Sequence, residues 1–164
     1  MRPTSAHAVR LLASVALVGV LALPVAGCKT TGDSDITGSI GASSGGDLRR
    51  DVDRWGARYR DNPNDVEIAI NYAQALRATD QRAQAVAVLE QVALRQPQNK
   101  ALLGAYGRAL ADAGRLEQAL DVLSRAHTPD QPDWRILSAQ GAVLDQLGRH
   151  QDAQRQYASA LKIQ

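Results

Sequence analysis

A fixed spacing of 34 residues recurs along the C-terminal part of this sequence. The residues related by this interval are Pro63 and Pro97, Gly114 and Gly148, and Ala85, Ala119 and Ala153. Proline and glycine interrupt regular structure, so their periodic return divides the chain into equal units. A constant period of this length indicates a repeat, in which each unit buries its apolar face against its neighbours. Residues 47–164 are therefore predicted to form one repeat domain.

Small and large apolar residues occupy the same places in each unit when the units begin at Val66, Lys100 and Trp134. The small residues are Ala73, Gly107 and Gly141 at the eighth position, and Ala85, Ala119 and Ala153 at the twentieth. The large ones include Leu76, Leu110 and Leu144 at the eleventh position, and Leu89, Leu123 and Tyr157 at the twenty-fourth. Small residues allow helices to cross closely, and intervals of three and four residues between large ones give each helix an apolar stripe.

This pattern resembles the tetratricopeptide repeat, a pair of antiparallel helices. The resemblance implies an all-α solenoid of three helix-turn-helix repeats at 66–99, 100–133 and 134–164. Gln131 departs from the family pattern because it replaces the terminal proline, although Pro129 and Pro132 lie close by. For function the resemblance implies only a binding scaffold.

Both ends of the array carry distinct sequence features. When the repeat numbering is extended towards the N-terminus, the apolar residues of 47–61 fall at the positions of a second repeat helix. This predicts one extra helix that covers the front of the first repeat. In the last repeat, Gln154 and Gln156 stand where the earlier repeats have apolar residues. Such a polar outer face is typical of a terminal unit. The sequence thus predicts seven helices, with the array ending at the third repeat.

The N-terminal segment has the features of a bacterial lipoprotein signal, predicted to span residues 1–27. Leu11 to Leu23 is an apolar stretch of 13 residues, too short for a membrane span of ~20 residues but typical of a secretory signal. The sequence Val25-Ala26-Gly27-Cys28 resembles the lipobox, which implies lipidation of Cys28 and cleavage before it. An ordinary secretory peptide with a chance cysteine is the alternative. Residues 28–46, rich in Gly, Ser and Thr, are predicted to be a lipidated flexible tether.

Charge and residue pattern argue against two classes of function. Removing residues 1–27 lowers Lys plus Arg from 19 to 17 while Asp plus Glu stays at 17, so the formal net charge changes from +2 to 0. This balance supplies no basic patch for nucleic acid. His127 and His150 are interpreted as surface residues without metal-ligand spacing, and Trp55 and Trp134 as core anchors, with a ligand platform as the alternative. We therefore expect no enzyme, cofactor or metal site.

In tetratricopeptide solenoids, the first helix of each repeat lines a concave groove. The candidate partner-binding residues at the corresponding positions are Ile70, Gln74, Arg77, Arg108, Arg135 and Asp145. Small neighbours such as Ala101, Gly104 and Ala142 leave room for a peptide or helix, and the arginines can bind carboxylates. Ordinary solvated helix surface is the alternative for each. The carboxylate clamp of chaperone-binding relatives is not matched, because Ile70, Gln74 and Ala105 stand at its polar or basic positions.

A lipobox followed by a short repeat array resembles the TadD-type lipoproteins of the tight-adherence (Flp) pilus. The resemblance implies a lipid-anchored protein on the periplasmic face of the outer membrane that helps a secretin or another pilus component to assemble. Lys29 is consistent with this location, since aspartate at that position is associated with inner-membrane retention. An adaptor that recruits peptidoglycan hydrolases or supports outer-membrane protein assembly is the alternative. Neither the protein partner nor the oligomeric state follows from these patterns.

Overall fold

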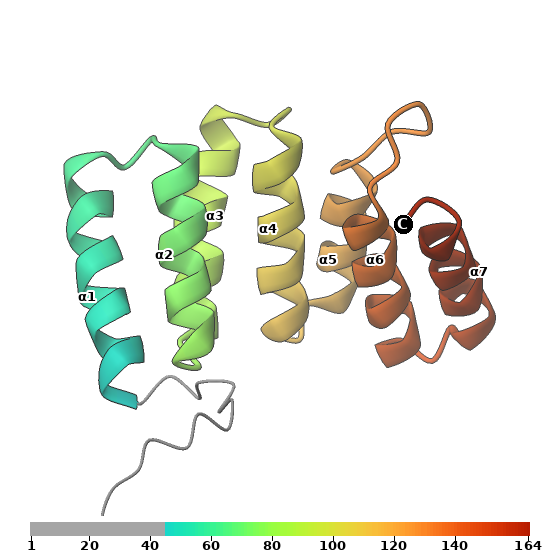
Figure 1. Ribbon diagram of the computed structural model, residues 1–164, viewed down its shortest axis with the longest axis horizontal. Coiled ribbons are helices and arrows are strands. Elements are labelled where there is room, and N and C mark those ends of the chain that lie inside the picture. Colours follow the sequence, from blue (N-terminus) through green and yellow to red (C-terminus); the bar gives the residue numbers. More distant parts are fainter. Residues whose placement is uncertain (1–44) are drawn as a thin grey trace, which may run out of the picture. The chain divides into compact units, whose positions relative to one another are not determined.

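The structure is a computed structural model that describes residues 45–164. The predicted signal segment, Cys28 and the tether up to residue 44 lie outside the described residues. The helices are α1 (Gly45–Asp61), α2 (Val66–Ala78), α3 (Arg82–Arg95), α4 (Lys100–Asp112), α5 (Leu116–Ser124), α6 (Trp134–Gln146) and α7 (His150–Leu161). No strand is present in this part of the chain, so the predicted all-α fold of three helix pairs preceded by one extra helix is confirmed (Figure 1).

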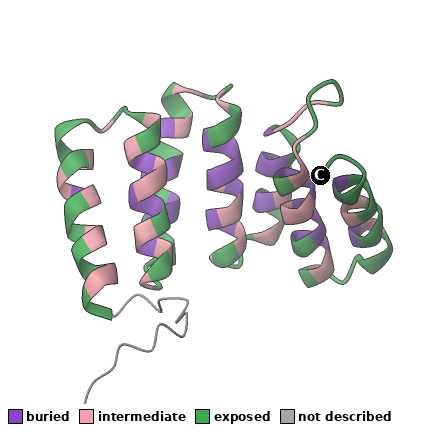
Figure 2. Ribbon diagram, in the orientation of Figure 1, coloured by how far each residue is buried: buried purple, intermediate pink, exposed green. Residues whose placement is uncertain are grey.

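Each helix packs against the next one along the chain, and two contacts skip a helix. These are the contacts of α2 with α4 and of α4 with α6 (Figure 1). The first helices of the three repeats therefore form one layer, and α3, α5 and α7 form the other. Buried residues concentrate between the two layers (Figure 2). Within residues 45–164, no helix combines the length and apolar character needed to cross a membrane.

The core lies where the two helices of a repeat cross, and small residues make those crossings close. A Cβ atom on Gly107 would lie 2.5 Å from Cγ of Leu123, and one on Gly141 would lie 2.5 Å from Cε1 of Tyr157. Such separations are well inside van der Waals contact. Glycine at the eighth position is thus matched to the large side chain at the twenty-fourth. The alanines at the twentieth position, Ala85, Ala119 and Ala153, are completely buried.

Side-chain caps fix the starts of α2, α4 and α6. The capping residues Asp65, Asn99 and Asp133 accept hydrogen bonds from the backbone N–H groups of Ile68, Leu102 and Arg135, at 2.9, 3.0 and 2.8 Å respectively. A polar side chain at this position satisfies one of the N–H groups that have no partner inside the helix. Because the caps recur at the repeat interval, the three helices begin in the same phase.

The turn between the two helices has the same left-handed residue in every repeat. Asp80, Gly114 and Gly148 have φ angles of 61°, 75° and 75°. In the last two repeats this residue is glycine, which adopts the conformation without strain. In the first repeat aspartate adopts it instead, which is one of the few residue types that tolerates a positive φ.

The connection from α5 to α6 departs from the regular repeat. Helix α5 has 9 residues, whereas α3 has 14, and residues 125–133, which we call the 125–133 loop, replace its missing final turns. Pro129 explains this early end, because proline cannot donate a backbone hydrogen bond and disfavours helical geometry in the residue before it. His127 in this loop was expected at the surface, but its Nδ1 is buried without a hydrogen-bond partner among the described residues.

Candidate functional site

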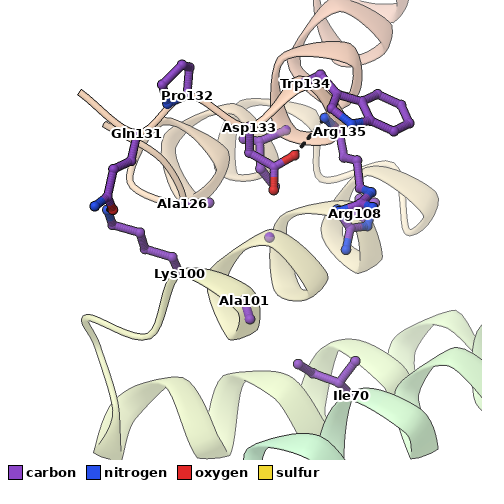
Figure 3. A pocket seen from close by; sticks show the side chains of 12 residues that line it. Ile70, Lys100, Ala101, Arg108, Ala126, Gln131, Pro132, Asp133, Trp134 and Arg135 are labelled. Atoms are coloured by element: carbon purple, nitrogen blue, oxygen red, sulfur yellow. Dashed lines mark hydrogen bonds between the residues drawn. The ribbon is translucent and has the colours of Figure 1, made fainter. Parts of the chain in front are cut away.

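The layer formed by α2, α4 and α6 contains two clefts that share one arginine. The larger cleft has a volume of about 540 Å³ and lies between Ile70 of α2, the first half of α4 and the 125–133 loop (Figure 3). The smaller cleft, of about 180 Å³, extends past Arg77 towards α6. Arg108 lines both. We call the two clefts together the groove.

Arg108 is a partly buried cation without a partner in the described structure. Its guanidinium group makes no hydrogen bond or ion pair with another residue of 45–164. Burial lowers the pKa of Arg108, and the positive charges of Arg77 and Arg135 lower it further, while Asp133 and Asp112 partly oppose them. The cation is thus held where its charge is incompletely compensated, which favours an anionic group in the groove.

The carboxylates of the groove are already engaged. Asp112 accepts a hydrogen bond from Nε of Arg77 at 2.5 Å, and Asp133 caps α6 through the backbone N–H of Arg135. Neither of these carboxylates makes a hydrogen bond or ion pair with Arg108 in the described part of the chain. The two clefts are lined by four cationic side chains, Arg77, Lys100, Arg108 and Arg135, and by the two carboxylates Asp112 and Asp133, so the lining is net positive.

Gly104 shapes the floor of the larger cleft. A Cβ atom at this position would lie 2.6 Å from Cδ1 of Ile136 and 3.7 Å from Nη1 of Arg108. The missing side chain therefore lets Ile136 of α6 pack closely against α4. That small residues leave room for a partner in the groove stays a prediction.

The structure brings together four of the six candidate partner-binding residues. Ile70, Arg108 and Arg135 line the larger cleft, and Arg77 lines the smaller one with Arg108. Gln74 is exposed on α2 and lines neither of these clefts. Their role in binding stays a prediction.

The sixth candidate, Asp145, contacts α7 instead. Its carboxylate lies 3.0 Å from Nδ1 of His150 and accepts a hydrogen bond of 3.2 Å from the Tyr157 hydroxyl. The hydrogen bond with His150 is the main cause of the lowered pKa of Asp145. Asp145 therefore joins α6 to α7 and is not part of the groove that Arg108 occupies.

Three groove features were not among the candidates. Lys100, Pro132 and Trp134 also line the larger cleft, Lys100 and Pro132 near Gln131 and Trp134 next to Arg135 (Figure 3). Lys100 donates a hydrogen bond of 3.1 Å to Oε1 of Gln131 and so joins the start of α4 to the 125–133 loop. The sequence signal for this wall was the loss of the expected proline at Gln131.

The two tryptophans have different environments. Trp55 is partly buried against the core, as expected. The core-anchor interpretation of Trp134 is wrong, because its ring is not part of the core cluster and lies at the cleft, with the Arg135 guanidinium carbon 5.2 Å from the ring centroid. An arginine over an aromatic ring at this distance makes a cation–π contact. Within residues 45–164, no group of three or more His, Cys, Asp or Glu could hold a metal ion.

These features define a tetratricopeptide-repeat fold with a basic groove. A comparison with protein families matches residues 80–142 to the tetratricopeptide repeat. A search of the curated proteins found no match.

Solved structures of MamA have a similar fold. One crystal structure of MamA has a TM-score of 0.63 and 19% identity, covering 73% of this chain and 70% of that one. MamA from Desulfovibrio magneticus RS-1 has a TM-score of 0.61 and 19% identity, covering 71% of this chain and 66% of that one. MamA AMB-1 has a TM-score of 0.60 and 24% identity, covering 71% and 69%. At these identities, the similarity establishes the fold alone.

Proposed function

We propose that this protein is a lipid-anchored scaffold on the periplasmic face of the outer membrane, where its groove binds a protein that takes part in assembling a tight-adherence pilus or its secretin. The observation that carries the binding role is Arg108, a partly buried cation without a partner between two clefts. Support for the anchor comes from the lipobox-like sequence that ends at Cys28. Support for the pilus role is the combination of this signal with a short repeat array.

Binding rather than catalysis is the role that the repeat fold favours. Stacked repeats present a long continuous surface, which suits an extended peptide or a helix better than a small substrate. The groove contains arginines, small residues and the half-buried Trp134, and these are groups that recognise protein segments.

The anchor is tested by changing the lipidation site. We expect Cys28→Ala to abolish acyl labelling and to move the protein out of the outer-membrane fraction. Each buried CH₂ group adds ~0.8 kcal/mol of membrane affinity, so one acyl chain binds marginally while several hold durably. Acyl labelling and membrane fractionation measure the effect. As a matched variant, Lys29→Asp should keep the label but shift the protein to the inner membrane. A wild-type protein without detectable lipid would contradict the anchor.

The binding site is tested in the groove. We expect Arg108→Ala, alone or with Ile70→Ala, to preserve the thermal melting curve and acyl labelling but to impair partner recovery and pilus assembly. Removing an arginine that pairs with a buried carboxylate costs ~2 to 5 kcal/mol, so affinity should fall at least ~30-fold. Crosslinking and pull-down from envelope extracts measure recovery of the partner.

The control for the groove variants is Arg155→Glu, which reverses an exposed charge on α7 outside both clefts. It should leave partner recovery and pilus assembly unchanged. If this control abolishes assembly while the groove variants behave like wild type, the binding surface belongs on the second helices of the repeats.

A further inference from the structure

The groove continues on both sides of Arg108. The larger cleft lies on one side of this residue, and the smaller cleft, lined by Arg77 and Ala142, lies on the other. A ligand that pairs with Arg108 can therefore extend in both directions along the layer of first helices. This arrangement suits a carboxylate on a side chain within a polypeptide segment better than one at the end of a chain.

The larger cleft places apolar surface next to this positive charge. Ile70 points into it from α2, and Trp134 and Pro132 border it on the opposite side (Figure 3). The two sides of the cleft thus match a segment in which an acidic side chain is flanked by an apolar one. A lipid headgroup would use the charge but not the apolar walls, so a protein segment is the better occupant.

The 125–133 loop gives this cleft a wall that the preceding repeat lacks. Helix α3 continues to Arg95, whereas α5 ends at Ser124. The loop residues Gln131 and Pro132 border the cleft instead. Three hydrogen bonds hold the loop, from Lys100 Nζ to Gln131 Oε1 at 3.1 Å and to Thr128 Oγ1 at 3.4 Å, and from Arg125 Nη2 to the Pro97 carbonyl oxygen at 3.4 Å.

We propose that the groove binds an internal segment of a partner protein in which an Asp or Glu side chain pairs with Arg108 while a neighbouring apolar side chain lies in the larger cleft between Ile70 and Trp134. This inference rests on the proposed function, because it names the chemistry of the partner at the same groove. The 125–133 loop closes one side of the cleft and limits the size of the apolar side chain.

The probe for this proposal is a displayed library of random 12-residue peptides whose C-termini are fused to a carrier and therefore carry no free carboxylate. Peptides are selected on the purified full-length protein, on Arg108→Gln and on Arg60→Gln. Arg60 is exposed on α1 and lines neither cleft, so its replacement removes the same charge outside the groove. The affinity of each selected peptide is then compared with that of its Glu→Gln or Asp→Asn counterpart by fluorescence anisotropy.

We expect the wild-type protein and Arg60→Gln to select peptides with an acidic residue beside an apolar one. The amide counterparts should bind at least ~10-fold more weakly to the wild-type protein, a difference of ~1.4 kcal/mol. With Arg108→Gln, the acidic peptide and its amide counterpart should bind equally.

Four outcomes would overturn the proposal. Selected peptides without acidic residues, or an unchanged acid preference in Arg108→Gln, would remove the pairing with Arg108 while leaving a peptide-binding scaffold. If a synthetic copy of a selected peptide binds only with a free C-terminal carboxylate and not when its C-terminus is amidated, the groove would be assigned to chain ends. Binding to anionic phosphatidylglycerol vesicles that is lost in Arg108→Gln, without selection of peptides, would assign the groove to lipid and would also contradict the proposed protein partner.

Discussion

Replacing Ala119 by leucine should lower the free energy of unfolding by ~1 to 3 kcal/mol, because the new side chain overpacks a helix crossing. Ala119 is completely buried. Its carbonyl oxygen lies 3.4 Å from the place where a Cβ atom on Gly107 would stand, so α4 and α5 are in close contact there. Three added carbon atoms have no space unless the two helices separate. Denaturant unfolding followed by circular dichroism measures the loss.

The matched control for Ala119→Leu is Gln154→Leu in α7, since Gln154 is exposed. A leucine there is added to the surface rather than to a crossing, and surface substitutions usually change stability by less than ~0.5 kcal/mol. Equal unfolding midpoints for Ala119→Leu and wild type would contradict the close crossing of α4 and α5.

The fold was predictable because its main determinants are local and repeated. Small residues at the eighth and twentieth positions indicate that the two helices of a repeat approach closely. This approach depends on residues of the same repeat and not on the rest of the chain. Gly107 and Gly141 illustrate the rule, since each faces the large side chain of the same repeat. Asp80 was harder to anticipate, because an L residue with a positive φ carries no glycine signal in the sequence.

The groove was predictable in part for the same reason. The repeat phase placed Ile70, Arg108 and Arg135 on the first helices, and they line one cleft. Asp145 stands at an equivalent repeat position, but its carboxylate contacts His150 and Tyr157 of the next helix. Tertiary contacts decide which of two neighbouring surfaces such a side chain joins, and they leave no periodic pattern in the sequence.

The replacement of the expected proline by Gln131 indicates an irregular connection, but the shape of the wall of the larger cleft was not predictable, because it depends on where α5 ends. Pro129 indicates an interruption but not the path of the chain after it. That path depends on contacts such as the Lys100 hydrogen bond with Gln131. The position of Trp134 outside the core follows from it, since this tryptophan begins α6 directly after the loop.

The largest loss of stability is expected for Leu123→Ala, at ~2 to 5 kcal/mol, because Leu123 is completely buried and its removal leaves a cavity. Gly107→Ala should cost ~1 to 3 kcal/mol through its clash with Leu123, partly offset by up to ~1 kcal/mol from the higher helix propensity of alanine. Urea unfolding of both variants and of the double variant measures how the two positions interact.

The double variant should be more stable than the sum of the two losses predicts, by ~0.5 to 3 kcal/mol, because truncating Leu123 removes the atoms that a Cβ at position 107 would meet. The matched control combines Gly107→Ala with Tyr157→Ala, whose helices α4 and α7 do not contact each other. These two losses should add within ~0.5 kcal/mol. Additive losses for the Gly107 and Leu123 pair would show that glycine at the eighth position is not matched to its partner at the twenty-fourth. The close crossing would then need another cause.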